Sequence, residues 1–266
     1  MALTAQQQTA LLQMTQAMFN AALGKVYLDA LSSQLEAGSS IASIAQGLLG
    51  TELFLGKSYA DDLAPSAFAQ TFVDDFIGNR ASSDSKTIAV NFIVSKITAG
   101  ATQNQIIAEI ANTLSSFSVT DPDWGEAALH FKTENINKVV NNLLADSVSA
   151  DDKASAVEAM LDQMSTGKTF GDVVEWAIKA LDDLDQTDPA WGLAAARFDN
   201  RTEVSHYYSI EKNGASTDLA TLQQILTGVT ADAASIETAK AAIDSLLNNP
   251  SESINLAELN GSNGFR

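Results

Sequence analysis

The side chains that could do chemistry are few, and the densest group of them is acidic. The stretch "DDLDQTD" places Asp182, Asp183 and Asp185 within four residues at the end of a predicted helix. Calcium in proteins is bound by several such oxygens, so the three aspartates are candidate calcium ligands. The stretch lacks the glycine and the terminal glutamate of an EF-hand loop. Helix capping and a solvated acidic face are therefore the competing interpretation.

A second group combines aromatic and hydrogen-bonding side chains. Aromatic faces beside polar groups can stack on sugar rings. The stretch "NRTEVSHYYSIEK" brings such residues together and predicts a glycan-binding surface made of Asn200, Arg201, His206, Tyr207 and Lys212. Trp124 and Trp191 occupy equivalent positions just inside two helices, and we interpret them as core anchors.

The remaining chemistry argues against an enzyme. The chain has two histidines, and His130 aligns with Arg197 in a second copy of the same motif, so an imidazole is not required there. There are no cysteines, which excludes disulfides and thiolate catalysis. Nucleophile elbows, P-loops, zinc-protease motifs and dinucleotide-binding glycine patterns are absent from the sequence. We predict a non-enzymatic protein.

The net charge of −18 restricts the partners of this chain. Nucleic acid is a poor partner, because binding phosphates needs clustered lysines and arginines. Direct adhesion to anionic lipid is disfavoured for the same reason. A divalent cation could bridge two negative surfaces. The N-terminus lacks the features of a cleavable signal peptide, and no apolar window is long enough to predict a membrane span.

A repeated sequence motif indicates where the helices that position these residues begin. "TDPDWGEAALHF", Thr120 to Phe131, returns as "TDPAWGLAAARF" after 67 residues. In each copy an aspartate suits the N-cap of a helix and a proline suits its first turn. The motif therefore marks the start of a helix in a repeated unit.

A second landmark extends the repeat to four units. Gly38, Gly100, Gly167 and Gly228 each follow an amphipathic helix, at separations of 62, 67 and 61 residues, and suit the left-handed position that ends one. A serine or threonine follows within two residues and is the expected N-cap of the next helix (Ser40, Thr102, Thr169, Thr230). The pattern predicts an all-α fold of stacked helical hairpins, or a helical bundle, built from about four repeats of 61–67 residues.

The same reading predicts the organisation of the chain. We expect helices near 4–22, 25–36, 41–54, 64–78, 86–98, 103–117, 122–145, 151–165, 170–184, 189–211, 217–227 and 233–247. A change of composition predicts an N-terminal helical subdomain at 1–79 and a helical repeat domain at 80–250. The helical pattern fades after Pro250, which predicts a linker at 251–266 toward a following module.

The stretch "LGKVYLDALSSQLEAGSSIASIAQGLLGTELF" resembles a helical repeat of bacterial surface-layer proteins and haemolysin-type calcium-binding (RTX) proteins. The match rests on Leu23, Gly24, Lys25, Gly38, Ser40 and the segment 52–54, whereas the usual central Gly-Leu-x-Tyr/Trp segment is missing. The resemblance implies the N-terminal helical region of a surface-layer or RTX-type protein of a Gram-negative bacterium, exported by a type I system. It implies no catalytic residues.

Three functional hypotheses follow. The first is an extracellular anchoring domain at the cell surface, part of a lattice that self-associates, which binds lipopolysaccharide or another surface polysaccharide with help from divalent cations such as calcium. The second is a structural spacer or self-assembly module of a large secreted adhesin or hydrolase. The third is a cytoplasmic helical-repeat scaffold that binds a protein partner.

Overall fold

The computed structural model describes residues 3–60 and 62–248, and within them the chain is all-helical, as predicted. Thirteen α-helices and one π-helical turn are present there, without a β-strand. They are α1 (Ala5–Phe19), α2 (Lys25–Glu36), α3 (Ile41–Leu49), α4 (Glu52–Leu55), α5 (Pro65–Phe76), α6 (Ser83–Thr98), α7 (Gln103–Ser116), α8 (Gly125–Leu144), α9 (Ala150–Ser165), α10 (Phe170–Asp182), α11 (Gly192–His206), η1 (Tyr207–Glu211), α12 (Leu219–Ile225) and α13 (Ala234–Asn248). The predicted linker at 251–266 lies outside the described residues.

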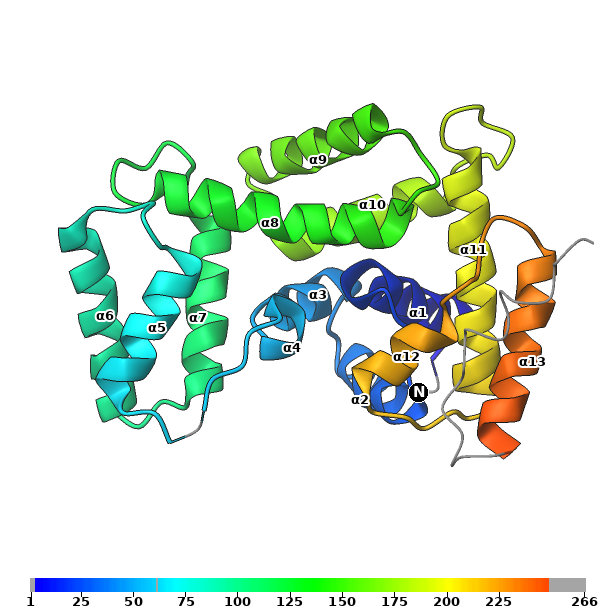
Figure 1. Ribbon diagram of the computed structural model, residues 1–266, viewed down its shortest axis with the longest axis horizontal. Coiled ribbons are helices and arrows are strands. Elements are labelled where there is room, and N and C mark those ends of the chain that lie inside the picture. The colour runs from blue at the N-terminus through cyan, green and yellow to red at the C-terminus, as the bar shows by residue number, and fades with distance from the viewer. Residues whose placement is uncertain (1–2, 61, 249–266) are drawn as a thin grey trace, which may run out of the picture.

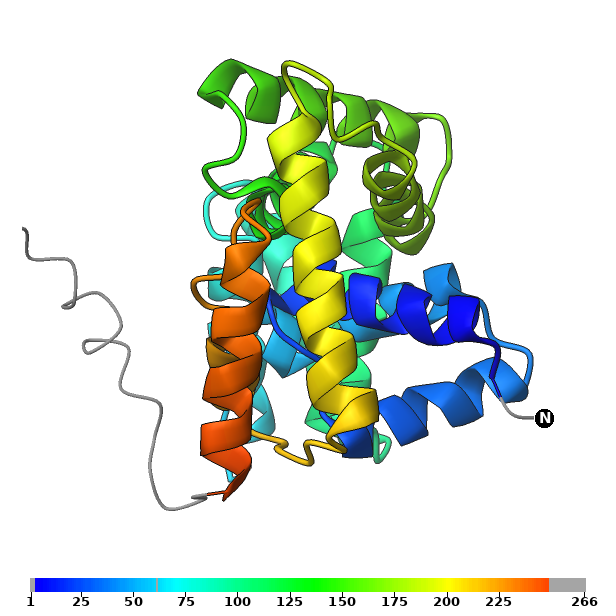
Figure 2. The ribbon, with the colours of Figure 1, turned by 90° about the vertical axis from the view of Figure 1, so that its right-hand side faces the viewer.

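The helices form an elongated bundle with two ends. In Figure 1, α5, α6 and α7 make one end, α11 and α13 make the other, and α8 runs between them with α9 above it. Figure 2 shows α11 and α13 side by side at their end of the molecule, and the two helices are in contact. Because α5 packs on α6, the predicted subdomain boundary after residue 79 falls between two paired helices.

The central helix of the bundle is α1. It contacts α3, α8, α10 and α11, and every residue from Leu11 to Phe19 is buried. Two hydrogen bonds join this helix to its neighbours: Gln16 Nε2 donates to Thr202 Oγ1 at 2.8 Å, and Asn142 Nδ2 donates to the carbonyl oxygen of Ala17 at 3.0 Å, whereas the buried Gln16 Oε1 has no partner among the described residues. Hydrogen bonds of this kind offset the cost of burying amides and fix α1 in register with its neighbours.

The glycines that define the four predicted units all adopt the left-handed conformation. Their φ angles are 99° for Gly38, 95° for Gly100, 93° for Gly167 and 80° for Gly228. An L-residue with a side chain rarely adopts this region, so glycine ends a helix there at the lowest cost. The glycine periodicity is therefore a real structural repeat.

The N-caps that follow these glycines agree with prediction in three units. Ser40, Thr102 and Thr169 each accept a hydrogen bond from the backbone N–H three residues on, and each belongs to a reciprocal capping box. In the fourth unit the prediction is wrong. Thr230 Oγ1 accepts from the N–H of Asp232 at 3.1 Å, and α13 begins only at Ala234.

The repeated Asp-Pro-x-Trp-Gly motif has the same geometry in both copies. Asp121 Oδ1 accepts from the N–H of Trp124 at 2.8 Å, and Asp188 Oδ1 accepts from the N–H of Trp191 at 2.8 Å. The glycine after each tryptophan packs against backbone, because a Cβ on it would lie 2.4 Å from a carbonyl oxygen at Gly125 and 2.2 Å at Gly192. The predicted N-caps at Asp121 and Asp188 are wrong by three residues, because α8 begins at Gly125 and α11 at Gly192, each after a tryptophan at the N-cap. The aspartates instead hold the turn that leads into each helix, and the first helical residue must be glycine.

Packing between units is closer than packing within them. α3 contacts both α7 and α10, and its partnership with α10 is the most extensive in the bundle. Two close approaches make this possible. A Cβ on Gly171 would lie 1.9 Å from the carbonyl oxygen of Ala42, and a Cβ on Gly50 would lie 2.5 Å from the Cα of Ala108.

Two predicted helices are interrupted. The helix expected at 41–54 ends at Leu49, and Thr51 then caps the short helix α4 by accepting from the N–H of Phe54 at 3.2 Å. The helix expected at 189–211 finishes in a π-helical turn, where the Ser209 hydroxyl donates to the backbone carbonyl oxygens of Ser205 and Leu23. These contacts attach the turn to the start of α2.

Candidate functional site

The five predicted glycan-binding residues lie in two separate places. Arg201 points into the bundle and is only 3% exposed, whereas Asn200 donates from Nδ2 to the carbonyl oxygen of Thr230 at 2.8 Å. The other three lie toward α13: His206 ends α11, Tyr207 begins η1, and Lys212 directly follows η1. The structure therefore does not bring the five together on one surface.

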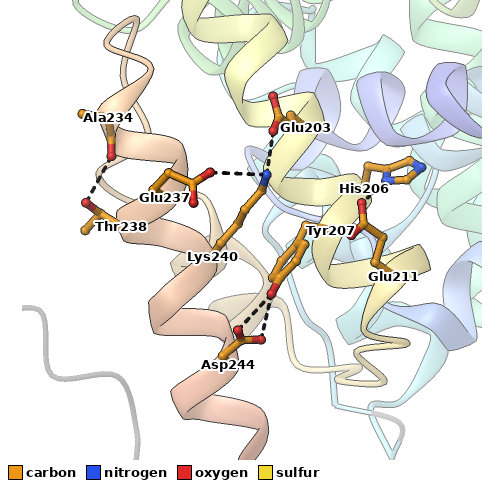
Figure 3. Close-up of polar contacts among 9 residues, drawn as sticks. All are labelled: Glu203, His206, Tyr207, Glu211, Ala234, Glu237, Thr238, Lys240 and Asp244. Atoms are coloured by element: carbon orange, nitrogen blue, oxygen red, sulfur yellow. Dashed lines mark hydrogen bonds and ion pairs between the residues drawn. The ribbon is translucent and has the colours of Figure 1, made fainter.

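The group near α13 is a closed polar network, drawn in Figure 3. The Tyr207 hydroxyl lies 2.9 Å from both carboxylate oxygens of Asp244, to which it donates. Lys212, which the figure does not draw, places its Nζ 2.6 Å from Asp244. Lys240 Nζ donates to Glu203 at 2.7 Å. The ammonium groups of Lys212 and Lys240 lie 5.0 Å and 5.5 Å from the centre of the Tyr207 ring.

The pKa values of this network follow from its pairing. The hydrogen bond from Lys212, then that from Tyr207, lowers the pKa of Asp244. The hydrogen bond to Asp244 raises the pKa of Lys212. His206 Nδ1 lies 3.2 Å from Glu211 Oε1 (Figure 3). Each charged group already has a partner of opposite sign, so the network attaches α13 to the π-helical turn and leaves few donors free for a sugar.

A polar pocket lies on the other side of α11. Its volume is about 500 Å³, and it is bounded by the end of α1, the segment between α8 and α9, α11, and the segment between α12 and α13. Arg197 and Arg201, one turn apart on α11, line it together with Asn20 and Asp146. Two of the four arginines in the sequence thus share one pocket.

Arg201 is buried without a counter-ion. Its Nη2 donates to Asn20 Oδ1 at 2.6 Å and to the Asn20 carbonyl oxygen at 3.3 Å, while its buried Nε has no hydrogen-bond partner. No carboxylate in the described part of the chain forms an ion pair with it. Burial, then the charge on Arg197, lowers the pKa of Arg201 well below its usual 12.5.

Arg197 is partly buried at the same wall. Its Nη1 donates to the carbonyl oxygen of Leu143 at 3.1 Å. Burial lowers its pKa, and the charge on Asp146 opposes that effect. The Asp146 carboxylate itself is fully exposed and lies 3.9 Å from Lys153 Nζ, so it does not neutralise the pocket.

The three candidate calcium ligands have other partners. Asp182 accepts from Gln13 Nε2, Asp183 pairs with Lys179 Nζ at 2.7 Å, and Asp185 accepts from the N–H of Thr187 at 2.8 Å. The hydrogen bonds from Thr187 lower the pKa of Asp185. Across residues 3–60 and 62–248, no three acidic or histidine side chains are grouped so that they could hold a metal ion.

A second pocket is apolar. It measures about 300 Å³ and lies among α8, α9 and α10, with Trp191 at one side. Trp176 borders it and is 42% exposed, in contrast to Trp124, which is half-buried and stacks on Phe117 with 6.2 Å between ring centres. The interpretation of Trp124 and Trp191 as residues that pack on the core agrees with their positions.

Sequence reasoning missed two residues of the polar pocket, Arg197 and Asn20. Arg197 appeared only as the counterpart of His130 in the repeated motif. Its spacing of four residues from Arg201, in a chain with four arginines, was the signal available. The sequence gives no sign that Asn20 belongs to the site, because its contact with Arg201 spans 181 residues of sequence.

None of the described helices is both long and apolar enough to cross a membrane. No protein-family model, curated protein or solved structure matches this chain.

Proposed function

We propose that this chain is a non-enzymatic anchoring domain of a surface-layer-type protein, which holds the protein at the cell surface by binding the polysaccharide of lipopolysaccharide. The polar pocket beside α11 carries the proposal. Its volume of about 500 Å³ suits one or two sugar rings, because small-ligand sites span roughly 300–1,000 Å³. Guanidinium, amide and hydroxyl groups at its wall supply the donors and acceptors that sugars need.

The same pocket is poorly equipped for catalysis. Among the described residues that line it Asp146 is the one carboxylate, and that side chain is fully exposed rather than held against a nucleophile. No histidine lines the pocket. General acid–base catalysis needs a positioned group whose pKa lies near the working pH, and the two arginines do not serve as one. Binding without reaction is the use that this geometry favours.

The proposal includes divalent cations because the chain and lipopolysaccharide are both negatively charged. The chain carries −18, and lipopolysaccharide cores are anionic, so the two surfaces repel. Calcium shared between acidic side chains and sugar phosphates would offset that repulsion. Its ligands would then come partly from the glycan, since the described residues do not supply a group of three on their own.

The test is a binding assay with the purified chain. Lipopolysaccharide is immobilised, and binding is measured by biolayer interferometry in calcium and again after EDTA. We expect saturable binding that weakens when the chelator is added. A neutral polysaccharide such as dextran is the control surface. Absence of binding to lipopolysaccharide in calcium would contradict the proposal, and binding indifferent to EDTA would remove the cation from it.

A self-assembly module is the alternative, and one surface favours it. Ile88 and Phe92 lie four residues apart on α6 and are 65% and 42% exposed. Apolar side chains exposed on one helix face often mark a contact between proteins. Sedimentation velocity over a range of concentrations tests this, with Ile88→Ser/Phe92→Ser as the variant. A monomer at all concentrations in calcium would contradict it.

A further inference from the structure

Two cations share one pocket in a protein with a large excess of acid, and neither forms an ion pair with a carboxylate of the described residues. Arg201 is 3% exposed and Arg197 is partly buried one helical turn away. Burying an unpaired charge is costly, and buried guanidinium groups are ordinarily matched by a carboxylate. Here Arg201 receives only the neutral oxygens of Asn20.

The buried Nε of Arg201 is an independent sign of an incomplete site. It has no hydrogen-bond partner, although buried polar groups in folded proteins nearly always have one. Arg201 is among the residues that line a pocket of about 500 Å³. The chain has 33 acidic side chains, yet none of those described pairs with either arginine.

We propose that Arg197 and Arg201 bind the oxyanion of an acidic sugar, either a sugar phosphate or a sugar carboxylate. A guanidinium group presents parallel N–H donors that match the oxygens of phosphate and carboxylate groups. An oxyanion in the pocket supplies the ion-pair partner that neither side chain has among the described residues, and Asn20 holds Arg201 in place for it. The pocket volume that remains accommodates the sugar ring.

This inference rests on the proposed function for the identity of the ligand as a glycan, whereas the anion site can be tested by itself. Isothermal titration calorimetry with glucose 6-phosphate, glucuronate, inorganic phosphate and glucose measures each affinity separately. We expect glucose 6-phosphate or glucuronate to bind, glucose not to bind, and inorganic phosphate to bind more weakly than the sugar acid. Equal affinity for inorganic phosphate and both sugar acids would overturn the assignment to a sugar.

Arg197→Gln is the decisive variant, because Arg197 is only partly buried and its loss leaves the Arg201–Asn20 contact intact. Arg80→Gln is the matched control, since Arg80 is also partly buried but lies in the turn between α5 and α6. We expect Arg197→Gln to weaken binding of the acidic sugar about tenfold or more, and Arg80→Gln to leave it unchanged. Circular dichroism verifies that both variants fold.

The outcomes separate the two proposals. An acidic sugar bound by the parent chain and by Arg197→Gln with the same affinity would overturn the anion site, as would no binding of any anionic probe. Lipopolysaccharide binding that survives Arg197→Gln would leave the anchoring function standing without this site. Binding of acidic sugars by a chain that fails to bind lipopolysaccharide would support the site and contradict the anchoring function.

Discussion

Asn20 ends α1 in the left-handed conformation, and from that position its side chain accepts a hydrogen bond from Arg201. The φ angle of Asn20 is 54°, and its Oδ1 lies 2.6 Å from Arg201 Nη2. Asparagine is one of the few residues with a side chain that tolerates this region. The residue therefore has two duties, which are to end the helix and to hold a buried cation.

Substitutions at Asn20 separate these duties. Asn20→Gly keeps the backbone conformation and loses the hydrogen bond to a charged group, so we expect a loss of about 1.5–3 kcal/mol in the free energy of unfolding. Asn20→Ala loses the same hydrogen bond and keeps a Cβ in the left-handed region without a side chain that can hydrogen-bond locally, so we expect it to be about 1–2 kcal/mol less stable than Asn20→Gly. Urea denaturation measures both. Equal stability of the two variants would show that the left-handed conformation does not matter at this residue.

At the contact between α10 and α3, adding a single Cβ atom should destabilise the fold. We expect Gly171→Ala to lower the free energy of unfolding by about 3 kcal/mol, because its Cβ would lie 1.9 Å from the Ala42 carbonyl oxygen and the helices would have to separate.

Gly47 of α3 is the control for Gly171→Ala. A Cβ there meets nothing within 4 Å, so Gly47→Ala should raise stability by about 0.5–1 kcal/mol through helix propensity alone. Urea denaturation of both variants gives opposite signs if packing at Gly171 sets the distance between the helices. If Gly171→Ala left the free energy of unfolding unchanged, that result would contradict the close approach of the two helices.

The two copies of the Asp-Pro-x-Trp-Gly motif should respond alike to the same change. Asp121→Ala and Asp188→Ala each remove an acceptor that serves two backbone N–H groups, so each should cost about 1 kcal/mol. Asp→Asn at either position retains the acceptor and serves as the control. The double variant, measured by urea denaturation, should show the sum, since the two turns share no partner. A cost confined to one copy would show that the motif is not structurally equivalent.

The parts of this fold that sequence predicts are those determined by near neighbours. A glycine that ends a helix and a capping box at Thr102 both act within a few residues, so the four-unit pattern was visible in the chain. The candidate site was not, because its contacts are distant in sequence. Arg201 looked like part of an exposed aromatic surface, yet it faces inward to Asn20. Likewise Asp182 looked like a calcium ligand, while its partner Gln13 lies 169 residues away.

Because of Tyr59, the free energy of unfolding should fall as the pH rises into the alkaline range. It is 8% exposed, and its hydroxyl donates to Asp75 Oδ2 at 3.0 Å. Burial first, then Asp75, raises the pKa of Tyr59 above its usual 10. Above pH 10 the unfolded chain releases this proton while the folded chain retains it, so the unfolded state binds fewer protons and stability falls as pH rises. For one tyrosine the loss is about 1.4 kcal/mol at pH 11.

The variant Tyr59→Phe tests this directly. At pH 8 it should be less stable than the parent chain by about 1.5–3 kcal/mol, because a hydrogen bond to a charged group is lost. At pH 11 the deficit should shrink by about 1.4 kcal/mol, since phenylalanine has no proton to release. Burial also raises the pKa of Tyr208, but that group is present in both chains and cancels in the difference. Urea denaturation at the two pH values measures the deficit, and a deficit equal at both would mean that the Tyr59 hydroxyl loses its proton as readily in the folded chain as in the unfolded one.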